Sequence, residues 1–392
     1  MRTQVAIIGA GPAGLMLAQL LHGYGLESII IERHDRAYIE RRLRAGVLEQ
    51  GTVDLLHAAG VGERLAREGL VHHGLYLQFD GQRHRIALSE LTGGRAITVY
   101  GQQEVVKDLI GARLAAGGQI CFEASDVRVY DFDTARPRVR FGWERAEHEL
   151  ECDFIAGCDG FHGVCRPAIP AAALRVYQKL YPFAWLGMLA AAPPATHELI
   201  YAYHEHGFAL QSMRSPELSR LYVQCAPGDQ IDQWPDERIW RELRDRLAMD
   251  DGWTLAEGPI LEKSVTTMRS FVVDPMRYGR LFLAGDAAHV VPPTGAKGMN
   301  LAIADVRVLA EALADWYRTG ATRLLDAYSA TCLRRVWRVQ HFSWWMTAML
   351  HRFDDDQDGF QHQLQLSQLR YVCGSQAAAT TLAENYVGME QV

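Results

Sequence analysis

The stretch QVAIIGAGPAGLMLAQLLHGYGLESIIIE at residues 4–32 decides the fold. Residues 4–8 are a short apolar run with the pattern of a buried parallel strand, and residues 28–32 are a second run of this kind. Between them, residues 12–23 have the pattern of a helix that begins at a proline and ends among glycines. Because strand, loop, helix and strand in this order are typical of doubly wound α/β domains, we expect such a domain here.

The loop after the first strand has the GxGxxG spacing of a dinucleotide-binding turn, formed by Gly9, Gly11 and Gly14. These glycines let the backbone turn tightly and approach a pyrophosphate, whose charge lies at the helix N-terminus. Glu32 ends the second strand, where its carboxylate can accept hydrogen bonds from a ribose. The alternative is a purely structural glycine turn, and the flanking strands and helix count against it. The glycines and Pro12 also interrupt the run too often for a signal peptide or a membrane span.

Composition narrows the class of protein. The chain has 392 residues, of which 48% are hydrophobic and 22% charged, as expected for a soluble globular protein of two domains. A net charge of -7 argues against a nucleic-acid partner. The seven cysteines are scattered, odd in number and without a CxxC pair, which argues against a disulfide framework or a metal site and favours the cytoplasm. No other segment is apolar enough to suggest a membrane span.

A second informative segment is RLFLAGDAAHVVPPTGAKGMNLA at residues 280–302. Asp286 follows an apolar strand, so its carboxylate can face the ribityl hydroxyls of a flavin. Pro292 and Pro293 remove two backbone donors and stiffen an extended segment whose carbonyls stay free to point at a ligand. Gly298 allows close approach, and a helix that begins beside it could stabilise negative charge on a reduced flavin. Together with the first loop, the segment predicts one extended ligand, FAD, held at both ends.

The pattern changes near residue 175, where alternating strands between residues 198 and 225 predict an antiparallel sheet. We expect this sheet to form an inserted domain that covers the substrate. The predicted division is an FAD-binding domain at 1–175 plus 270–349, a substrate-binding sheet domain at 176–269, and a helical C-terminal region at 350–392. Two long helices are predicted at 303–319 and 324–352.

Residues 33–50 are predicted to form a charged helical region, rich in arginine. Because a nicotinamide coenzyme has no second GxGxxG fold in this chain, it would have to dock transiently, and arginines could bind its phosphates. The alternative is a solvated helix face, which is the usual role of such a run and the preferred one for most of these arginines.

The chain resembles a known family, the class A flavoprotein aromatic hydroxylases, over nearly its whole length. The segments that carry the resemblance are VAIIGAGPAG (5–14), RAGVLEQG (44–51), IAGCDGFHG (155–163), HELIYAYH (197–204), SMRS (212–215), SFVVDPM (270–276), LFLAGDAAHVVPPTGAKGMNLA (281–302), FSWWMT (342–347) and AENYVG (383–388). The resemblance implies a Rossmann-like FAD-binding domain of the glutathione-reductase type with an inserted, mainly antiparallel sheet domain and a helical C-terminal region. It also implies a homodimer.

The activity that the resemblance implies is hydroxylation of 4-hydroxybenzoate at its 3-position. FAD, a nicotinamide coenzyme and O2 would act through a flavin C4a-hydroperoxide, and the product would be 3,4-dihydroxybenzoate. Two alternatives stay open. One is a related hydroxylase for another aromatic acid, such as 4-aminobenzoate or 3,4-dihydroxybenzoate, and the other is a non-catalytic flavin-binding regulatory protein, which would need none of the substrate residues.

Family residues that hold the substrate carboxylate correspond to Ser212, Arg214 and Tyr222. Strand alternation agrees with this assignment, since Ser212 and Arg214 are two residues apart and would share a face. Tyr222 would likewise share a face with Arg220 on the next strand. A guanidinium with two hydroxyls forms a charge-assisted clamp for a carboxylate.

At the phenol end, the resemblance assigns proton removal to Tyr201, Tyr386 and His72. A tyrosine relay can carry the proton from a dry pocket to a histidine that titrates near neutral pH. Without the resemblance, the sequence would not choose between His72 and its neighbour His73. The carbonyl of Pro293 is expected to contact the substrate oxygen.

The remaining residues that the resemblance assigns bind cofactors. The FAD contacts are Arg42, Arg44, Gln102, Asp159, Arg220, Asp286, Gly298, Met299 and Asn300. The NADPH contacts are Arg33, Tyr38, Arg42, Arg44, His162, Arg166 and Arg269. An arginine near the adenosine 2′-phosphate favours NADPH. His34 and Asp35 depart from the NADPH-specific pattern, and Asp35 could repel that phosphate, so NADH or dual use stays open.

Overall fold

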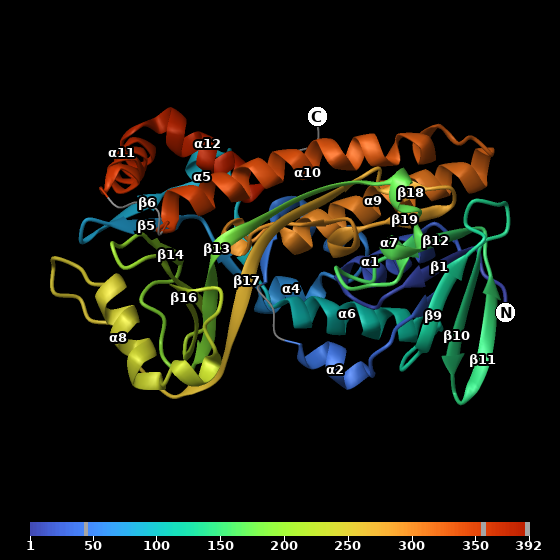
Figure 1. The fold of residues 1–392 in the computed structure, drawn as a ribbon, viewed down its shortest axis with the longest axis horizontal. Coiled ribbons are helices and arrows are strands. Elements are labelled where there is room, and N and C mark those ends of the chain that lie inside the picture. The colour runs from blue at the N-terminus through green and yellow to red at the C-terminus, as the bar shows by residue number, and fades with distance from the viewer. Residues whose placement is uncertain (43–45, 354–357, 389–392) are drawn as a thin grey trace.

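The computed structural model describes residues 1–42, 46–353 and 358–388. Its first layer is a six-stranded sheet of order β18-β19-β12-β1-β2-β8, in which β1, β2, β8, β12 and β19 run parallel (Figure 1). The strands are β1 (Val5–Ile8), β2 (Ser28–Ile31), β8 (Ile120–Cys121), β12 (Phe154–Gly157), β18 (Arg277–Tyr278) and β19 (Leu281–Leu283). Helix α1 (Pro12–Gly23) joins β1 to β2. The predicted doubly wound unit is therefore confirmed, and the 281–283 strand returns to it.

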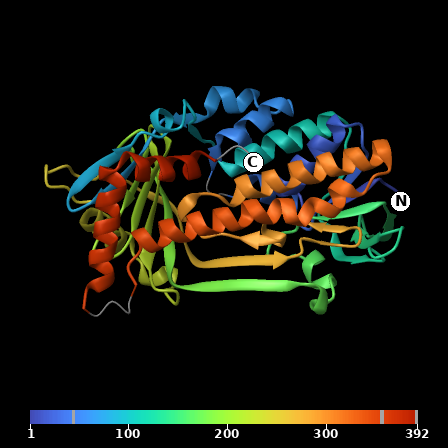
Figure 2. The ribbon, with the colours of Figure 1, turned by 90° about the horizontal axis from the view of Figure 1, so that it is seen from above.

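A second, eight-stranded sheet has the order β20-β17-β13-β16-β15-β14-β5-β6. Its strands are β5 (Leu75–Phe79), β6 (Gln82–Ile86), β13 (Arg175–Ala190), β14 (Leu199–Ala202), β15 (Ala209–Ser215), β16 (Leu218–Cys225), β17 (Ile260–Asp274) and β20 (His289–Val290). The strands predicted between residues 198 and 225 are confirmed as an antiparallel set. The long strands β13 and β17 run side by side along the molecule (Figure 2).

This sheet extends beyond the region predicted for it. Strands β5 and β6 form a hairpin far upstream, and β5 pairs with β14 in parallel. The hairpin turns at Asp80 and Gly81, which both have positive φ angles (49° and 66°). An Asp-Gly turn of this kind is a strong local hairpin signal that the sequence analysis missed. The division into domains stays a prediction, because one continuous sheet includes strands on both sides of the predicted boundaries.

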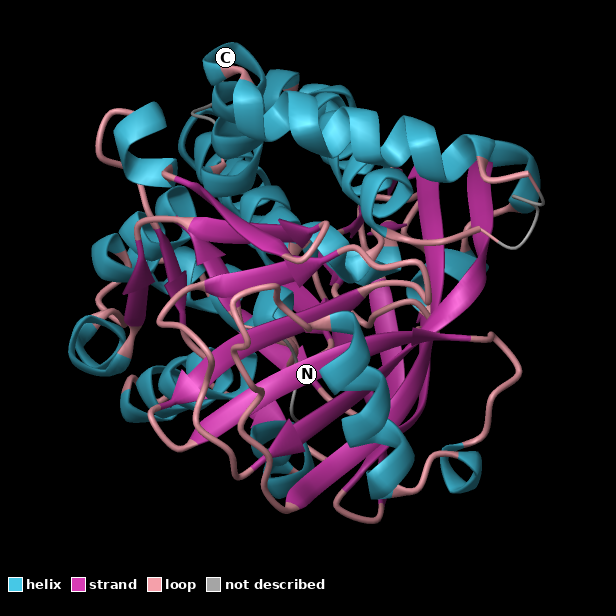
Figure 3. Ribbon diagram, turned by 90° about the vertical axis from the view of Figure 1, so that its left-hand side faces the viewer, coloured by secondary structure: helices cyan, strands magenta, loops and turns pink. Residues whose placement is uncertain are grey.

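Helices lie on both faces of the eight-stranded sheet, and Figure 3 shows a row of helices above the strands and another helix in front of them. One face packs against α10 (Arg323–Leu350), α11 (Phe360–Gly374) and α12 (Gln376–Val387), and the other against α8 (Asp236–Arg246). Helix α9 (Gly298–Thr319) packs on α1 and ends at Gly320, whose φ of 75° is the left-handed conformation of a helix end. The two predicted long helices are thus confirmed.

Two three-stranded sheets complete the fold. One consists of β9 (Ser125–Tyr130), β10 (Arg138–Trp143) and β11 (Ala146–Glu151). The other consists of β3 (Val47–Glu49), β4 (Leu70–His72) and β7 (Ile97–Val99). The remaining α-helices are α2 (Arg36–Arg41), α3 (Gln50–Ala58), α4 (Glu63–Glu68), α5 (Leu88–Leu91), α6 (Gln102–Ala115) and α7 (Cys165–Ala168). The helical region predicted at 33–50 is wrong in part, because residues 47–49 pair with β7 as a strand. None of the helices in the described ranges is long and apolar enough to cross a membrane.

Candidate active site

The glycine-rich loop after β1 is shaped by contacts that leave no room for side chains. A Cβ on Gly14 would lie 2.0 Å from the carbonyl oxygen of Gly9. Gly9 has a φ of 102°, and a Cβ there would lie 2.5 Å from the carbonyl oxygen of Cys158. A Cβ on Gly11 would meet nothing within 4 Å, because this position faces open space. The loop is therefore held against β12 and α1 while its middle is left free for a ligand.

This open space is a cavity of about 270 Å³ that collects residues from distant parts of the chain. Predicted FAD residues that line it are Gly9, Gly11, Glu32, Arg42, Gln102, Asp159, Asp286, Gly298 and Met299. Arg33 lines it as well. Gly14, Arg220 and Asn300 are not among its lining residues, and Arg44 lies outside the described residues. The two segments that the sequence singled out, 4–32 and 280–302, therefore meet at one cavity.

The polar groups of this cavity suit a ligand that carries hydroxyls and a pyrophosphate. Asp159 Oδ2 accepts a hydrogen bond from the Cys165 amide at 2.8 Å, whereas Asp159 Oδ1 is buried without a partner among the residues described. Burial raises the pKa of Asp159. Glu32 accepts hydrogen bonds from the amides of Ala10 and His34, both at 2.8 Å, which orients its carboxylate. With the N-terminus of α1 beside them, these groups fit FAD.

The Gly-Asp turn after β19 is anchored by a buried pair that the sequence analysis missed. Asp305 Oδ2 accepts a hydrogen bond from the Gly285 amide at 2.9 Å and lies 2.6 Å from His289 Nε2. Burial lowers the pKa of His289, but the Asp305 carboxylate outweighs it and raises the pKa above its usual value. The neighbouring Asp286 is exposed and lines the cavity, as a ligand contact requires.

A second brace fixes the start of α9. Asn300 accepts a hydrogen bond from the Glu49 amide and donates one to the Val47 carbonyl, both at 2.9 Å. The buried Lys297 donates to Glu49 Oε1 at 2.7 Å, and Arg335 donates to Glu49 Oε2 at 2.9 Å. Asn300 therefore ties α9 to β3, and this tie is how it would support the flavin position. Lys297 and Glu49 were missed, although a lysine inside a glycine-rich apolar run is a signal that could have found them.

Two of the three side chains predicted for the proton relay are in contact. The hydroxyls of Tyr201 on β14 and Tyr386 on α12 lie 2.5 Å apart, and both side chains are buried. Burial raises the pKa of both phenols above the usual value. His72 is also buried, and its two ring nitrogens have no partner among the residues described. Burial lowers the pKa of His72 to about 4, so the expectation that it titrates near neutral pH is wrong for this form of the protein.

The predicted carboxylate clamp lies on β15 and β16, where Ser212 pairs with Arg220. Arg220 Nε donates to the hydroxyl of Tyr222 at 3.2 Å, which confirms that these two side chains share a face. The register shifts between Met213 and Ser215, so alternation alone does not fix the direction of Arg214.

Arg214 Nη1 is buried and has no hydrogen-bond partner within the described ranges, and burial lowers its pKa. Arg214 and Arg220 line a cavity of about 380 Å³ together with Tyr100, Gln103 and Leu189. A buried cation with an unpaired N–H group calls for an anionic ligand.

The expectation of an extended segment with free carbonyls at Pro293 is wrong. Residues Pro293–Gly295 form a 3₁₀ turn, and the Pro293 carbonyl accepts a hydrogen bond from the Ala296 amide at 2.9 Å. The turn ends at Ala296, which adopts a left-handed conformation with a φ of 53°. A carbonyl oxygen has a second lone pair, so a contact with the substrate oxygen stays a prediction.

The predicted coenzyme residues lie in two groups. In the first, Asp35 caps α2 by accepting a hydrogen bond from the Tyr38 amide at 2.6 Å, and His34 stacks on Tyr38 with ring centroids 4.1 Å apart. His34 and Asp35, the two residues that depart from the NADPH pattern, thus stabilise the start of α2. In the second, Arg166 and Arg269 both lie against the ring of Phe161, at 4.7 and 4.6 Å, next to the exposed His162.

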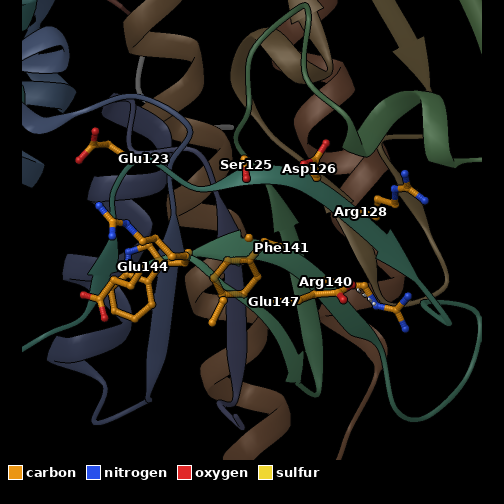
Figure 4. Close-up of a pocket in the computed structure, with 12 residues that line it drawn as sticks. Glu123, Ser125, Asp126, Arg128, Arg140, Phe141, Glu144 and Glu147 are labelled. Carbon is orange, nitrogen blue, oxygen red and sulfur yellow. Dashed lines mark ion pairs between the residues drawn. The ribbon is translucent and has the colours of Figure 1, made fainter.

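Another cavity, of about 540 Å³, lies on the three-stranded sheet β9–β11 (Figure 4). Its lining carries charges of both signs, including Arg140 and Glu147, whose side chains pair at 3.4 Å. None of the residues predicted for catalysis, substrate or cofactor lines it. We therefore assign no part of the chemistry to this cavity. No cluster of histidine, cysteine or acidic side chains in the described part of the chain could hold a metal ion.

Residues 2–343 match the family described as FAD binding domain, and the chain belongs to this family. The chain is 51% identical over 389 residues to p-hydroxybenzoate hydroxylase of Acinetobacter baylyi, covering 99% of this chain and 96% of the relative. It is 24% identical over 370 residues to a probable NADH-specific resorcinol 4-hydroxylase of Rhodococcus jostii, covering 83% and 61% of the two chains. The structure of p-nitrophenol 4-monooxygenase from Pseudomonas putida has the same fold, with a TM-score of 0.83 and 17% identity over 99% of each chain.

Proposed function

We propose that the protein is an FAD-dependent monooxygenase that hydroxylates 4-hydroxybenzoate at the 3-position and yields 3,4-dihydroxybenzoate. The proposal draws on the 51% identity to p-hydroxybenzoate hydroxylase over nearly the whole chain. The observation that carries it is that one sheet bears groups for both ends of this substrate. Arg214 offers a carboxylate a guanidinium whose buried Nη1 has no partner in the described part of the chain, and Tyr201 offers a buried hydroxyl paired with Tyr386 for a phenol.

The clamp would attract the substrate carboxylate by its positive charge and orient it by hydrogen bonds. Arg214 would pair with the substrate carboxylate, and the hydroxyls of Ser212 and Tyr222 would donate hydrogen bonds to it. Because the guanidinium is buried, its charge is weakly screened and strongly favours an anion. Binding would also satisfy the Nη1 donor, which lacks a partner among the described residues. The substrate is thereby oriented with its phenol toward Tyr201.

The tyrosine pair would move the phenol proton without either tyrosine ionising. The pKa of both hydroxyls is raised, so each would accept one proton and donate another at the same time. Bound FAD, once reduced by the coenzyme, would activate O2 for attack by the ionised phenol ring. His72 would take the proton at the end of the relay, across a bridging water. With a pKa of about 4 it would pass the proton to solvent and not store it.

Product analysis tests the proposed function. Purified protein supplied with FAD, a reduced nicotinamide coenzyme, O2 and 4-hydroxybenzoate should form 3,4-dihydroxybenzoate in proportion to coenzyme consumed. The same assay with 4-aminobenzoate and with 3,4-dihydroxybenzoate distinguishes a related hydroxylase. Absence of coenzyme oxidation with every aromatic acid would favour the non-catalytic flavin-binding alternative.

NADPH is the coenzyme that we propose, with Arg33 and Arg42 as candidates for its 2′-phosphate. We expect kcat/KM for NADPH to exceed that for NADH about tenfold, as one charge-assisted contact gives. The Arg42→Ser variant should lose most of this advantage, and its FAD content is measured alongside because Arg42 also lines the FAD cavity. Equal or higher kcat/KM with NADH would overturn the choice of NADPH. That result would agree with an Asp35 carboxylate held at the start of α2, where it could repel a 2′-phosphate, and with the relative named as NADH-specific.

We also propose a homodimer in the cytoplasm. Trp337 and Trp344 on α10 are 42% and 43% exposed, and their spacing of seven residues places them on one face of the helix. Trp344 is therefore not a core residue, and two exposed tryptophans on one helix face suit contact with a second copy of the chain. Light scattering on the purified protein tests this. The seven cysteines are all free, which supports a reducing compartment.

A further inference from the structure

His351, the residue that follows α10, is a buried histidine to which the proposed mechanism gives no role. Its side chain is fully buried, and Trp185 Nε1 on β13 donates a hydrogen bond to His351 Nε2 at 2.6 Å. On the other side of the ring, His351 Nδ1 lies 3.0 Å from the carbonyl oxygen of Thr347 in the last turn of α10. The imidazole thus connects the end of this helix to β13 of the eight-stranded sheet.

The two contacts determine where the ring proton is. An indole N–H can only donate, so His351 Nε2 must accept. A carbonyl can only accept, so the proton is on Nδ1. Burial lowers the pKa of His351 to about 3, which keeps the ring in this neutral form. His351 is therefore a fixed acceptor for the indole of Trp185 and is not an acid–base group.

Aromatic rings hold His351 in a single orientation. The ring of Phe208 lies 4.4 Å away at 21°, and that of Phe183 lies 4.6 Å away at 11°. Trp185 is also nearly parallel to the imidazole, at 10°. An acceptor held in this way fixes both the position and the tilt of the indole plane.

Trp185 in turn forms a wall of the predicted carboxylate clamp. Its ring centroid is 4.9 Å from that of Tyr222, with a tilt of 47°. Tyr222 pairs with Gly187 on β13, where a Cβ would come within 2.7 Å of the tyrosine ring. The ring of Tyr222 thus occupies the space that Gly187 leaves open, and Trp185 limits its movement on one side.

We propose that His351 is a positioning residue for substrate binding, which holds the indole of Trp185 so that Tyr222 presents its hydroxyl to the substrate carboxylate. This inference rests on the proposed function, because it assigns Tyr222 to the clamp. It makes the end of α10, a segment without predicted site residues, a determinant of affinity for the aromatic acid. The effect should appear in substrate binding and not in the chemical step.

Two substitutions separate the hydrogen bond from the packing. His351→Phe keeps a flat ring in the aromatic stack and removes the acceptor, whereas His351→Gln retains an amide oxygen near the position of Nε2. We expect His351→Phe to raise the Kd for 4-hydroxybenzoate about tenfold, with kcat changed less than about twofold, since a buried N–H would lose its partner. His351→Gln should restore most of the affinity. Equal Kd values for His351→Phe and the wild type would overturn the proposal.

A double-mutant cycle tests whether His351 acts through the indole. Trp185→Phe removes the donor, so adding His351→Phe to it should raise the Kd by less than about twofold. Fully additive effects of the two substitutions would show that His351 acts by another route. His362→Asn is the matched control, because His362 Nδ1 lies 2.6 Å from the hydroxyl of Tyr203, a tyrosine outside the clamp. Its Kd should equal that of the wild type.

An independent readout keeps this proposal separate from the proposed function. The indole N–H resonance of Trp185, identified as the signal lost in Trp185→Phe, should shift strongly in His351→Phe and weakly in His351→Gln in ligand-free protein. If the shift occurs but no variant or wild type binds 4-hydroxybenzoate, the proposed function fails while the positioning contact stands. An unshifted resonance in His351→Phe would overturn the contact itself.

Discussion

Arg214→Ala should weaken the binding of 4-hydroxybenzoate at least about a hundredfold. The guanidinium is the charged member of the predicted clamp, and two charge-assisted hydrogen bonds to a carboxylate are worth about 3 kcal/mol or more together. The Kd can be measured by titrating the flavin absorbance of purified protein with the substrate. Arg214→Lys should recover only part of the affinity, because a single ammonium cannot bind a carboxylate through two parallel N–H groups.

Arg214→Ala should weaken substrate binding without lowering the stability of the ligand-free protein. In the ligand-free protein, Arg214 is a buried cation whose Nη1 has no partner among the residues described. Removing such a group relieves a desolvation penalty, so we expect the Tm of ligand-free Arg214→Ala to equal or exceed that of the wild type. The stabilisation that added substrate gives to the wild type should be lost in the variant.

Arg83→Ala is the matched control for this experiment. Arg83 lies on β6 of the same sheet, has a buried Nη2 without a partner in the described ranges, and packs 4.1 Å from the ring of Trp253. It does not line the cavity that Arg214 lines. Its removal should leave the substrate Kd unchanged. Unchanged affinity in Arg214→Ala would refute the clamp, and a large Tm loss would mean that the guanidinium has a structural partner.

The parts of this site that could be predicted from sequence are those that short-range chemistry determines. Gly9 and Gly14 occupy positions where a Cβ would collide with backbone, so the spacing of glycines in the sequence directly reflects the turn. The strand and helix around them followed from apolar runs and a proline. The second segment was found for the same reason, since glycine and proline mark a change of backbone direction whatever the tertiary context.

The parts that could not be predicted depend on contacts between distant segments. The turn at Pro293 ends at Ala296 in a left-handed conformation, which alanine rarely favours by itself. The lowered pKa of His72 comes from burial, which its local sequence does not reveal. A register shift between Met213 and Ser215 in β15 means that strict alternation does not determine the direction of Arg214. In each case packing of the whole fold outweighs the local preference.

Tyr201→Phe should separate coenzyme oxidation from hydroxylation. The substitution keeps the ring and removes the hydroxyl that lies 2.5 Å from Tyr386, so the substrate phenol would have no route for its proton. We expect coenzyme oxidation in the presence of 4-hydroxybenzoate to continue, while product formation falls about a hundredfold and the balance appears as hydrogen peroxide. Parallel assays of coenzyme, product and peroxide measure this ratio.

Two comparisons show whether the lost hydroxyl acts as a proton carrier. Tyr203→Phe removes another phenol near the same strand, one that is bonded to His362 and Gln365, and should keep full coupling. Raising the pH toward about 9–10 should restore part of the product yield in Tyr201→Phe, because more of the phenol then enters the site already ionised. Full coupling in Tyr201→Phe at neutral pH would remove the tyrosine from the mechanism. A defect that does not respond to pH would instead mean that Tyr201 positions the substrate and carries no proton.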